Sequence, residues 1–201
     1  MASTWDHPEL GTFTYDGNAW VNKIHMPAFK AFSYVTPYSR GRSTGRHELA
    51  FQAWDEDETP SAGAVALAKR VLANQKELVA KVAEALWQDF NGEGPESGMW
   101  WHGQIDQIAR AIHGDKPPTD AQALLGALRI SRVKVFKQWD DQYDKPIVEL
   151  SFHTPFDGGH GVSVLTDSEA ILGIGYDGDL RLFKPAKKPR RGGGGREDAN
   201  L

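Results

Sequence analysis

The chain has 201 residues, of which 40% are hydrophobic and 25% charged, and its formal net charge is −4. This length and composition are typical of one globular domain with a sizeable core. The absence of cysteine excludes disulfides, thiolate catalysis and cysteine-based zinc sites. No apolar run approaches the roughly 18 residues of a membrane-spanning helix, and the first residues lack the pattern of a secretory signal. We therefore expect a cytoplasmic protein.

Charge is unevenly distributed along the chain. Residues 1–183 hold 17 basic and 25 acidic groups, a net charge of −8, whereas residues 184–201 hold six basic and two acidic groups, a net charge of +4. Proline, four consecutive glycines and clustered charge predict disorder in the second segment. The sequence thus predicts a single domain over 1–183 and a basic, disordered tail over 184–201. Nucleic-acid association through this tail is one alternative function, although the acidic body is poorly matched to phosphates.

The first part of the chain predicts strands. Aromatic and polar residues alternate over 11–16, Asp-Gly-Asn follows as a turn, and 19–26 predicts the returning strand of a hairpin. Residues 28–35 and 47–54 predict a second strand pair. The segment between them is rich in Gly, Ser and Arg, as surface loops are.

Helices are predicted in the middle of the chain. Residues 61–90 predict one long amphipathic helix, with Ser61 or Thr59 as its N-cap. Its apolar stripe follows four-three spacing and comprises Ala68, Leu72, Gln75, Val79, Val82, Leu86 and Phe90. Residues 100–114 predict a second helix. A short third helix follows, with Asp120 or Thr119 as its cap.

The last part predicts strands again, at 129–139, 146–153, 161–167 and 170–178, where β-branched and aromatic residues lie between turn signals. The order of strands, helices and strands lacks the strict alternation of α/β proteins. It indicates an α+β fold, in which N- and C-terminal strands form a mostly antiparallel sheet and the central helical block packs on it.

Short motifs at both ends of the domain resemble a family of bacterial α+β domains of unknown function that is immunity-protein-like. The family begins with "G-x-F-x-x-D…W" and ends with "D…HG" ahead of two strands. The matching residues are Gly11, Phe13, Asp16, Trp20, Asp157, His160, Gly161 and Gly175. Some members of this family occur beside polymorphic toxins, so the resemblance implies a protein-binding module. It implies no catalytic residue.

The stretch "TPFDGGHGVSV" (154–164) raises the possibility of a functional histidine. A general base needs an orienting carboxylate, and a metal needs further ligands. His153, Asp157 and His160 could supply a metal-dependent hydrolase site if the two histidines face each other across a hairpin. The simpler interpretation makes Asp157 and Gly158 a tight turn with His160 beside it. We favour this turn and keep Asp157 and His160 as candidate binding residues.

The stretch "RGRSTGR" (40–46) is the second candidate. Arg40, Arg42 and Arg46 could clamp an anion or contact an acidic partner. The stretch matches neither a Walker loop nor a dinucleotide fingerprint. A solvated loop is the simpler interpretation, and partner contact is the alternative.

Two other stretches have structural explanations. The acids of "WDEDET" (54–59) lack the spacing of a calcium loop and suit the N-terminal end of a helix. In "MWWHG" (99–103) we expect one buried tryptophan and one half-buried neighbour. With no nucleophile elbow and no metal or cofactor motif, we expect a non-enzymatic, protein-binding module without cofactors. Its partner and oligomeric state stay open.

Overall fold

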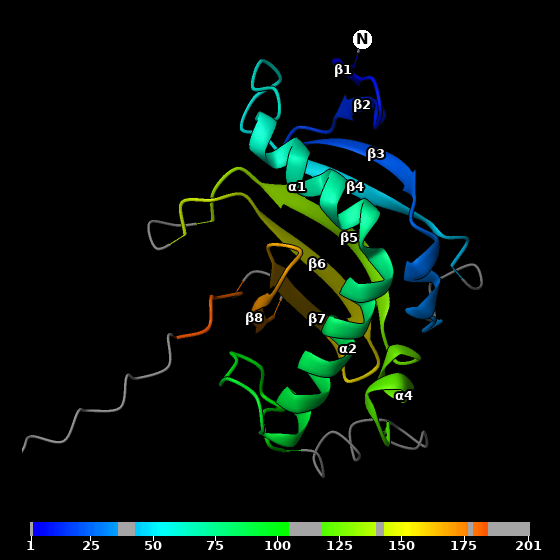
Figure 1. Cartoon of the computed structure of the whole chain (residues 1–201), viewed down its shortest axis with the longest axis vertical. Coiled ribbons are helices and arrows are strands. Elements are labelled where there is room, and N and C mark those ends of the chain that lie inside the picture. The colour runs from blue at the N-terminus through cyan, green and yellow to red at the C-terminus, as the bar shows by residue number, and fades with distance from the viewer. Residues whose placement is uncertain (1, 36–42, 105–117, 140–142, 177–178, 185–201) are drawn as a thin grey trace, which may run out of the picture.

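A single eight-stranded sheet organises the chain (Figure 1). The computed structural model describes residues 2–35, 43–104, 118–139, 143–176 and 179–184. The strands follow one another across the sheet in chain order. They are β1 (Thr4–His7), β2 (Gly11–Tyr15), β3 (Ala19–His25), β4 (Arg46–Gln52), β5 (Arg129–Phe136), β6 (Ile147–Thr154), β7 (Asp157–Thr166) and β8 (Ile171–Gly175). Every neighbouring pair is antiparallel except β4 and β5, which are parallel.

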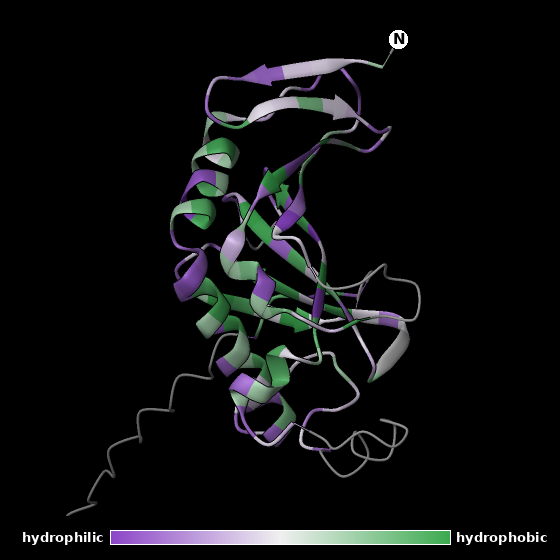
Figure 2. Cartoon of the chain, turned by 90° about the vertical axis from the view of Figure 1, so that its right-hand side faces the viewer, coloured by the Kyte–Doolittle hydropathy of each residue, from purple (hydrophilic) through white to green (hydrophobic). Residues whose placement is uncertain are grey.

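The parallel pair is joined by the helical part of the chain. Two parallel neighbours need a crossover connection, and here it contains α1 (Ala62–Ala73), α2 (Gln75–Asn91) and α4 (Ala121–Leu125). Helices α1 and α2 lie across one face of the sheet, as Figures 1 and 2 show. The predicted mixed fold with a mostly antiparallel sheet is confirmed, although the sheet dominates and the helical block is small. Among the described helices, none is long and apolar enough to cross a membrane.

For the helix predicted over 61–90, the N-cap and the apolar stripe were correct, but the prediction of one continuous helix was wrong. The Ser61 hydroxyl accepts a hydrogen bond from the Ala64 N–H at 3.2 Å, as a helix N-cap does. The predicted helix over 61–90 is two helices, because Asn74 leaves the helical conformation with φ −107° and ψ 22°. After the break, α2 runs in a different direction from α1 across the sheet face (Figure 1). Asp120 caps α4 as expected, accepting from the Ala123 N–H at 2.7 Å.

The predicted strand over 28–35 is wrong. Residues Pro27–Ala31 form a 3-10 helix, η1, which begins at a proline that cannot donate to a strand ladder. Phe29 and Phe32 point into the core, and their rings meet at 5.7 Å. In a 3-10 helix, a spacing of three residues brings two aromatic side chains to one face. The sequence pattern of residues 28–35 did not distinguish this helix from a strand. Strand β1, which pairs with β2, was not predicted.

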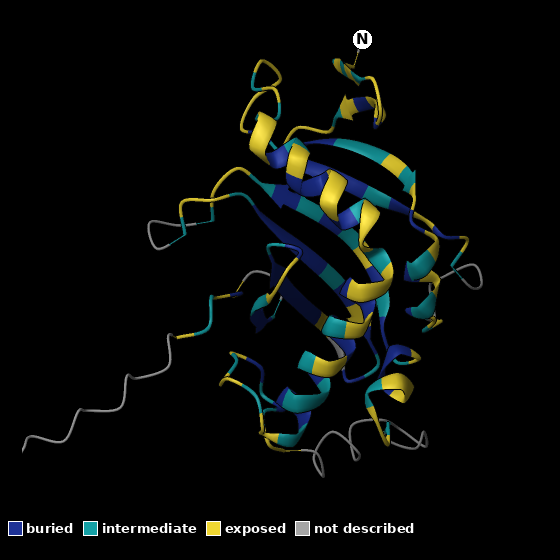
Figure 3. Cartoon of the chain, in the orientation of Figure 1, coloured by how far each residue is buried: buried dark blue, intermediate teal, exposed yellow. Residues whose placement is uncertain are grey.

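The core lies between the helices and the sheet face that they cover (Figure 3). One side chain in two along each central strand enters it, as the pleat of a strand requires. The fully buried members include Phe51 of β4, Val133 of β5, Leu150 of β6 and Val164 of β7, packed with Leu67, Val71, Val82 and Leu86 of the helices. Deep burial of this many large side chains supplies the main favourable free energy of folding.

The opposite face of the sheet is more polar and carries a second, small apolar cluster. Arg132 of β5 bridges Glu48 at 2.5 Å and Asp16 at 3.8 Å. The cluster, called here the outer cluster, has Ile147, Leu165 and Leu180 at its buried centre. Partly buried side chains pack against this centre, namely Phe136, Trp139, Tyr143, Leu172 and Leu182.

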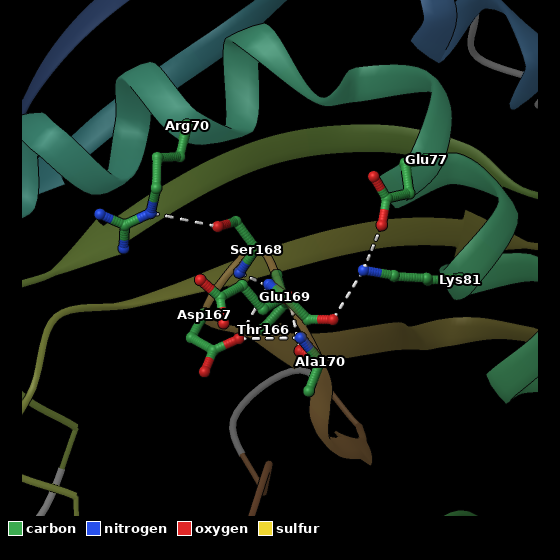
Figure 4. A network of polar contacts seen from close by, with 8 residues as sticks. All are labelled: Arg70, Glu77, Lys81, Thr166, Asp167, Ser168, Glu169 and Ala170. Atoms are coloured by element: carbon green, nitrogen blue, oxygen red, sulfur yellow. Dashed lines mark hydrogen bonds and ion pairs between the residues drawn. The ribbon is translucent and has the colours of Figure 1, made fainter.

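The turn between β7 and β8 ties the sheet to both long helices (Figure 4). The Asp167 carboxylate accepts from the N–H groups of Glu169 and Ala170, each at 2.9 Å, and so holds the turn closed. Lys81 of α2 donates to the Glu169 carbonyl at 2.7 Å. Arg70 of α1 reaches the Ser168 hydroxyl at 3.4 Å. These two hydrogen bonds fix α1 and α2 relative to the β7–β8 end of the sheet.

The two edges of the sheet differ. Strand β1 is a four-residue edge that carries Asp6. At the other edge, residues 179–183 run beside β8, where the Phe183 N–H donates to the Leu172 carbonyl at 2.8 Å. Short, charged edges and covered edges are both ways to stop further strands from pairing.

We expect His47 to make folding stability depend on pH. Burial, and then the positive charge of Arg129, lowers the pKa of His47 from 6.5 to about 4. Between pH 6.5 and 4 the unfolded chain therefore binds more protons than the folded one. The free energy of unfolding should fall by up to about 3 kcal/mol as the pH drops through this window. Urea unfolding at a series of pH values measures it.

The matched control is His47→Gln, which keeps a polar side chain of similar length without a titrating group. Its free energy of unfolding should lose less on acidification than that of the wild type. Parallel pH profiles for the two chains would show that His47 is not responsible.

Candidate functional site

An open groove of about 650 Å³ lies where β4 and β5 end. Its lining comes from the last residue of each strand and from the segment that follows it, namely Gln52, Trp54 and Glu58 for β4, and Phe136, Lys137, Gln138 and Trp139 for β5. The groove follows from the topology, because neighbouring parallel strands bring their carboxyl ends, and the loops after them, to the same edge. Ligands commonly bind at such edges of α/β sheets. We call this site the Trp54 groove.

Trp54 stands out among the groove residues because its side chain faces solvent. It is 82% exposed, while most large apolar side chains of the described residues are buried. Its backbone is nevertheless held, since the Trp54 N–H donates to the Glu58 carboxylate at 3.0 Å and Trp20 donates its indole N–H to the Glu58 carbonyl at 2.8 Å. The indole is thus presented to solvent from a fixed loop.

The other wall of the groove is aromatic as well. The rings of Phe136 and Trp139 meet edge to face, with centroids 4.9 Å apart. Lys134 places its ammonium 5.0 Å from the Phe136 ring, so this wall already holds one cation against an aromatic face. The Phe136 and Trp139 side chains pack against the outer cluster, which holds them in place.

The loop that presents Trp54 is strongly acidic. Four consecutive acids follow it, Asp55 to Glu58. Asp55 accepts from the N–H groups of Asp57 and Glu58 at 3.0 and 2.9 Å, which fixes the shape of the loop. Partial burial, and then the carboxylates of Asp55, Asp16, Glu56 and Glu58, raise the pKa of the Tyr15 phenol. The negative potential therefore extends over the loop and neighbouring β2, with Lys137 as a single opposite charge in the lining.

A second polar centre surrounds Asp89, near the C-terminal end of α2. Its side chain is 1% exposed and accepts from the Trp101 indole N–H at 2.5 Å and the Ser97 hydroxyl at 2.9 Å. His102 Nδ1 lies 2.8 Å from the other carboxylate oxygen. The Asp89 carboxylate thus binds three side chains of the loop that follows α2 and holds this loop against the helix. Trp101 is buried and Trp100 half-buried, as the sequence predicted.

The structure places His160 differently from the expected turn. The turn between β6 and β7 is formed by Pro155 and Phe156, because Thr154 pairs with Asp157. His160 is the fourth residue of β7, in the stretch where the register shifts between Phe152 and Thr154. The expectation that Asp157 and Gly158 form the turn is therefore wrong. Proline and a buried phenylalanine turn the chain instead.

The two histidines of this candidate site are both exposed. His160 is exposed, and its ring lies 5.8 Å from that of Tyr176 in an edge-on arrangement. His153 is exposed on β6 opposite Arg129. The side chain of Asp157 lies outside the described residues. Within the described part of the chain, no three His, Cys, Asp or Glu side chains gather closely enough to hold a metal ion.

The arginine candidates are not brought to the Trp54 groove. Arg46 begins β4 and donates to the Lys23 carbonyl at 2.6 Å, whereas Trp54 follows the opposite end of the same strand. Arg40 and Arg42 lie outside the described residues, as do the predicted helix from residue 105 onward and the basic tail from residue 185.

The acids of the Trp54 loop do not have the position that the sequence predicted. Helix α1 begins at Ala62, and its first turn contains no acid. Asp55 and Glu58 instead accept hydrogen bonds from backbone N–H groups of the loop, and Glu56 accepts from the Ser3 hydroxyl. The dipole explanation is therefore wrong for these residues.

Comparison with known proteins adds no relative. No family model matches the chain, and neither a curated protein nor a solved structure matches it. The functional interpretation therefore depends on the geometry of this chain alone.

We expect Asp89→Ala to destabilise the fold strongly. The change leaves the Trp101 N–H and its polar neighbours without their buried acceptor, which should cost about 3 kcal/mol in free energy of unfolding. Urea denaturation measures it. Glu84→Ala removes an exposed acid from the same helix and should change stability by less than about 0.5 kcal/mol. Equal losses in both variants would refute the role of Asp89.

Proposed function

We propose that this protein is a non-enzymatic protein-binding module, which holds a basic segment of a partner protein in the Trp54 groove. The observation that carries the proposal is the exposed indole of Trp54. Tryptophan is among the residues that contribute most to protein–protein affinity, and an exposed one beside further aromatic rings marks an interaction surface.

The charge around the groove favours a basic partner. Asp55 to Glu58 border Trp54, and their field reaches Tyr15. An arginine or lysine of the partner would find carboxylates at the rim and an indole face for a cation–π contact, which contributes about 1 kcal/mol at an exposed site. Complementary charge would also speed association with a basic protein.

The aromatic wall formed by Phe136 and Trp139 supplies the apolar part of the contact. Phe136 and Trp139 are supported by the outer cluster, so the groove does not have to be assembled when a partner arrives. A preformed surface lowers the entropy cost of binding. The proposal is compatible with the immunity-like role that the family resemblance implies, in which a partner such as a basic toxin would be masked.

We expect Trp54→Ala to abolish partner capture while leaving the fold intact. The tagged chain is incubated with lysate of its source organism, and bound proteins are identified by mass spectrometry. A stoichiometric partner should be retained by the wild type and lost with Trp54→Ala. Because the indole is 82% exposed, its removal should change the free energy of unfolding by less than about 0.5 kcal/mol.

Two further variants define the specificity of the capture. Asp57→Lys reverses one rim charge and should weaken retention, with a loss that shrinks at high salt. Val35→Ala removes the other large apolar side chain that is exposed among the described residues, and it should have no effect. A partner that is retained equally by Trp54→Ala and the wild type would show that the groove is not its binding site.

A further inference from the structure

The C-terminal end of the described chain runs along β8 and packs on the outer cluster, which also supports the aromatic wall of the Trp54 groove. Leu182 packs against the outer cluster, and so do the groove residues Phe136 and Trp139. The last described residue is Lys184, two positions further on. The chain beyond Lys184 therefore starts from the same outer cluster that supports the aromatic wall of the groove.

The segment that follows has the charge opposite to that of the acidic loop after Trp54. Residues 184–191 read Lys-Pro-Ala-Lys-Lys-Pro-Arg-Arg and contain five basic side chains and no acid. Of the acids Asp55 to Glu58 that follow Trp54, Glu58 lines the groove together with Trp139. At about 3.3 Å per residue, the seven residues 185–191 span up to roughly 23 Å from Lys184.

We propose that residues 185–191 of this same chain bind in the Trp54 groove and compete there with the partner. The inference rests on the proposed function, because it gives that site a second, internal ligand of the same chemistry. Lysine and arginine side chains meet the acidic rim, and one of them stacks on Trp54. The two prolines favour an extended backbone, which suits an open groove.

Competition within one chain is effective even when each contact is weak. A short flexible connection gives an attached ligand an effective concentration in the millimolar range. A partner must therefore displace the segment before it binds. Removing the positive charge of the segment should raise the apparent affinity for an added basic ligand.

A paramagnetic label tests the contact directly. The chain has no cysteine, so Gly193→Cys gives a single attachment point for a nitroxide. The indole N–H signal of Trp54, assigned by its loss in Trp54→Phe, should broaden severalfold more than that of buried Trp101. The broadening should disappear at high salt and in the same labelled chain carrying Arg190→Glu and Arg191→Glu.

A peptide of residues 184–192, added to the full chain, separates this inference from the proposed function. We expect it to bind the Arg190→Glu, Arg191→Glu chain at least tenfold more tightly than the wild type, and to lose this binding with Trp54→Ala. Equal, Trp54-dependent binding to both chains, without broadening of the Trp54 signal, would overturn the internal contact and leave the proposed function standing. If the peptide binds neither chain, the groove does not accept basic segments and both proposals fail.

Discussion

The parallel pairing of β4 with β5 is the constraint on which the rest of the structure depends. Glu48 pairs with Arg132 and Phe51 with Val135, so residues more than 80 positions apart in the chain are adjacent in the sheet. The connection between them has to cross the sheet, and it does so as the helices that cover the core. The same pairing brings Trp54 and Trp139 to one edge. Core and groove are therefore consequences of one strand pair.

The sequence predicted those elements that are determined by residues close together in the chain. The Ser61 and Asp120 caps, the hairpin of β2 and β3 and the strand character of β5 to β8 are set by neighbouring residues, and they were predicted. The parallel pair was not, because its partners share no local signal. Prolines misled in two places, since Pro27 starts a 3-10 helix and Pro155 takes part in a turn that Asp157 and Gly158 were expected to form.

The candidate site shows the same limit. "WDEDET" drew attention through its acids, yet the informative residue is the tryptophan before them. Its exposure depends on the loop contacts to Trp20 and Glu58, which no periodicity reveals. Trp139 was counted as part of a strand end. Only the sheet brings the two indoles to one groove, so a sequence-based search for motifs could not find it. The partnership of Asp89 with His102 was hidden in the same way, because thirteen residues separate them.

The segment beside β8 has a consequence for self-association. Strand β8 reads Ile-Leu-Gly-Ile-Gly and contains no charge, which makes it a good template for strand addition. Residues 179–183 lie along it and use the Leu172 carbonyl, while Leu180 covers the apolar side chains of the outer cluster. A protease cut just before Asp179 would release this cover. The β8 edge would then present its free backbone groups to another strand, whereas the β1 edge stays short and charged.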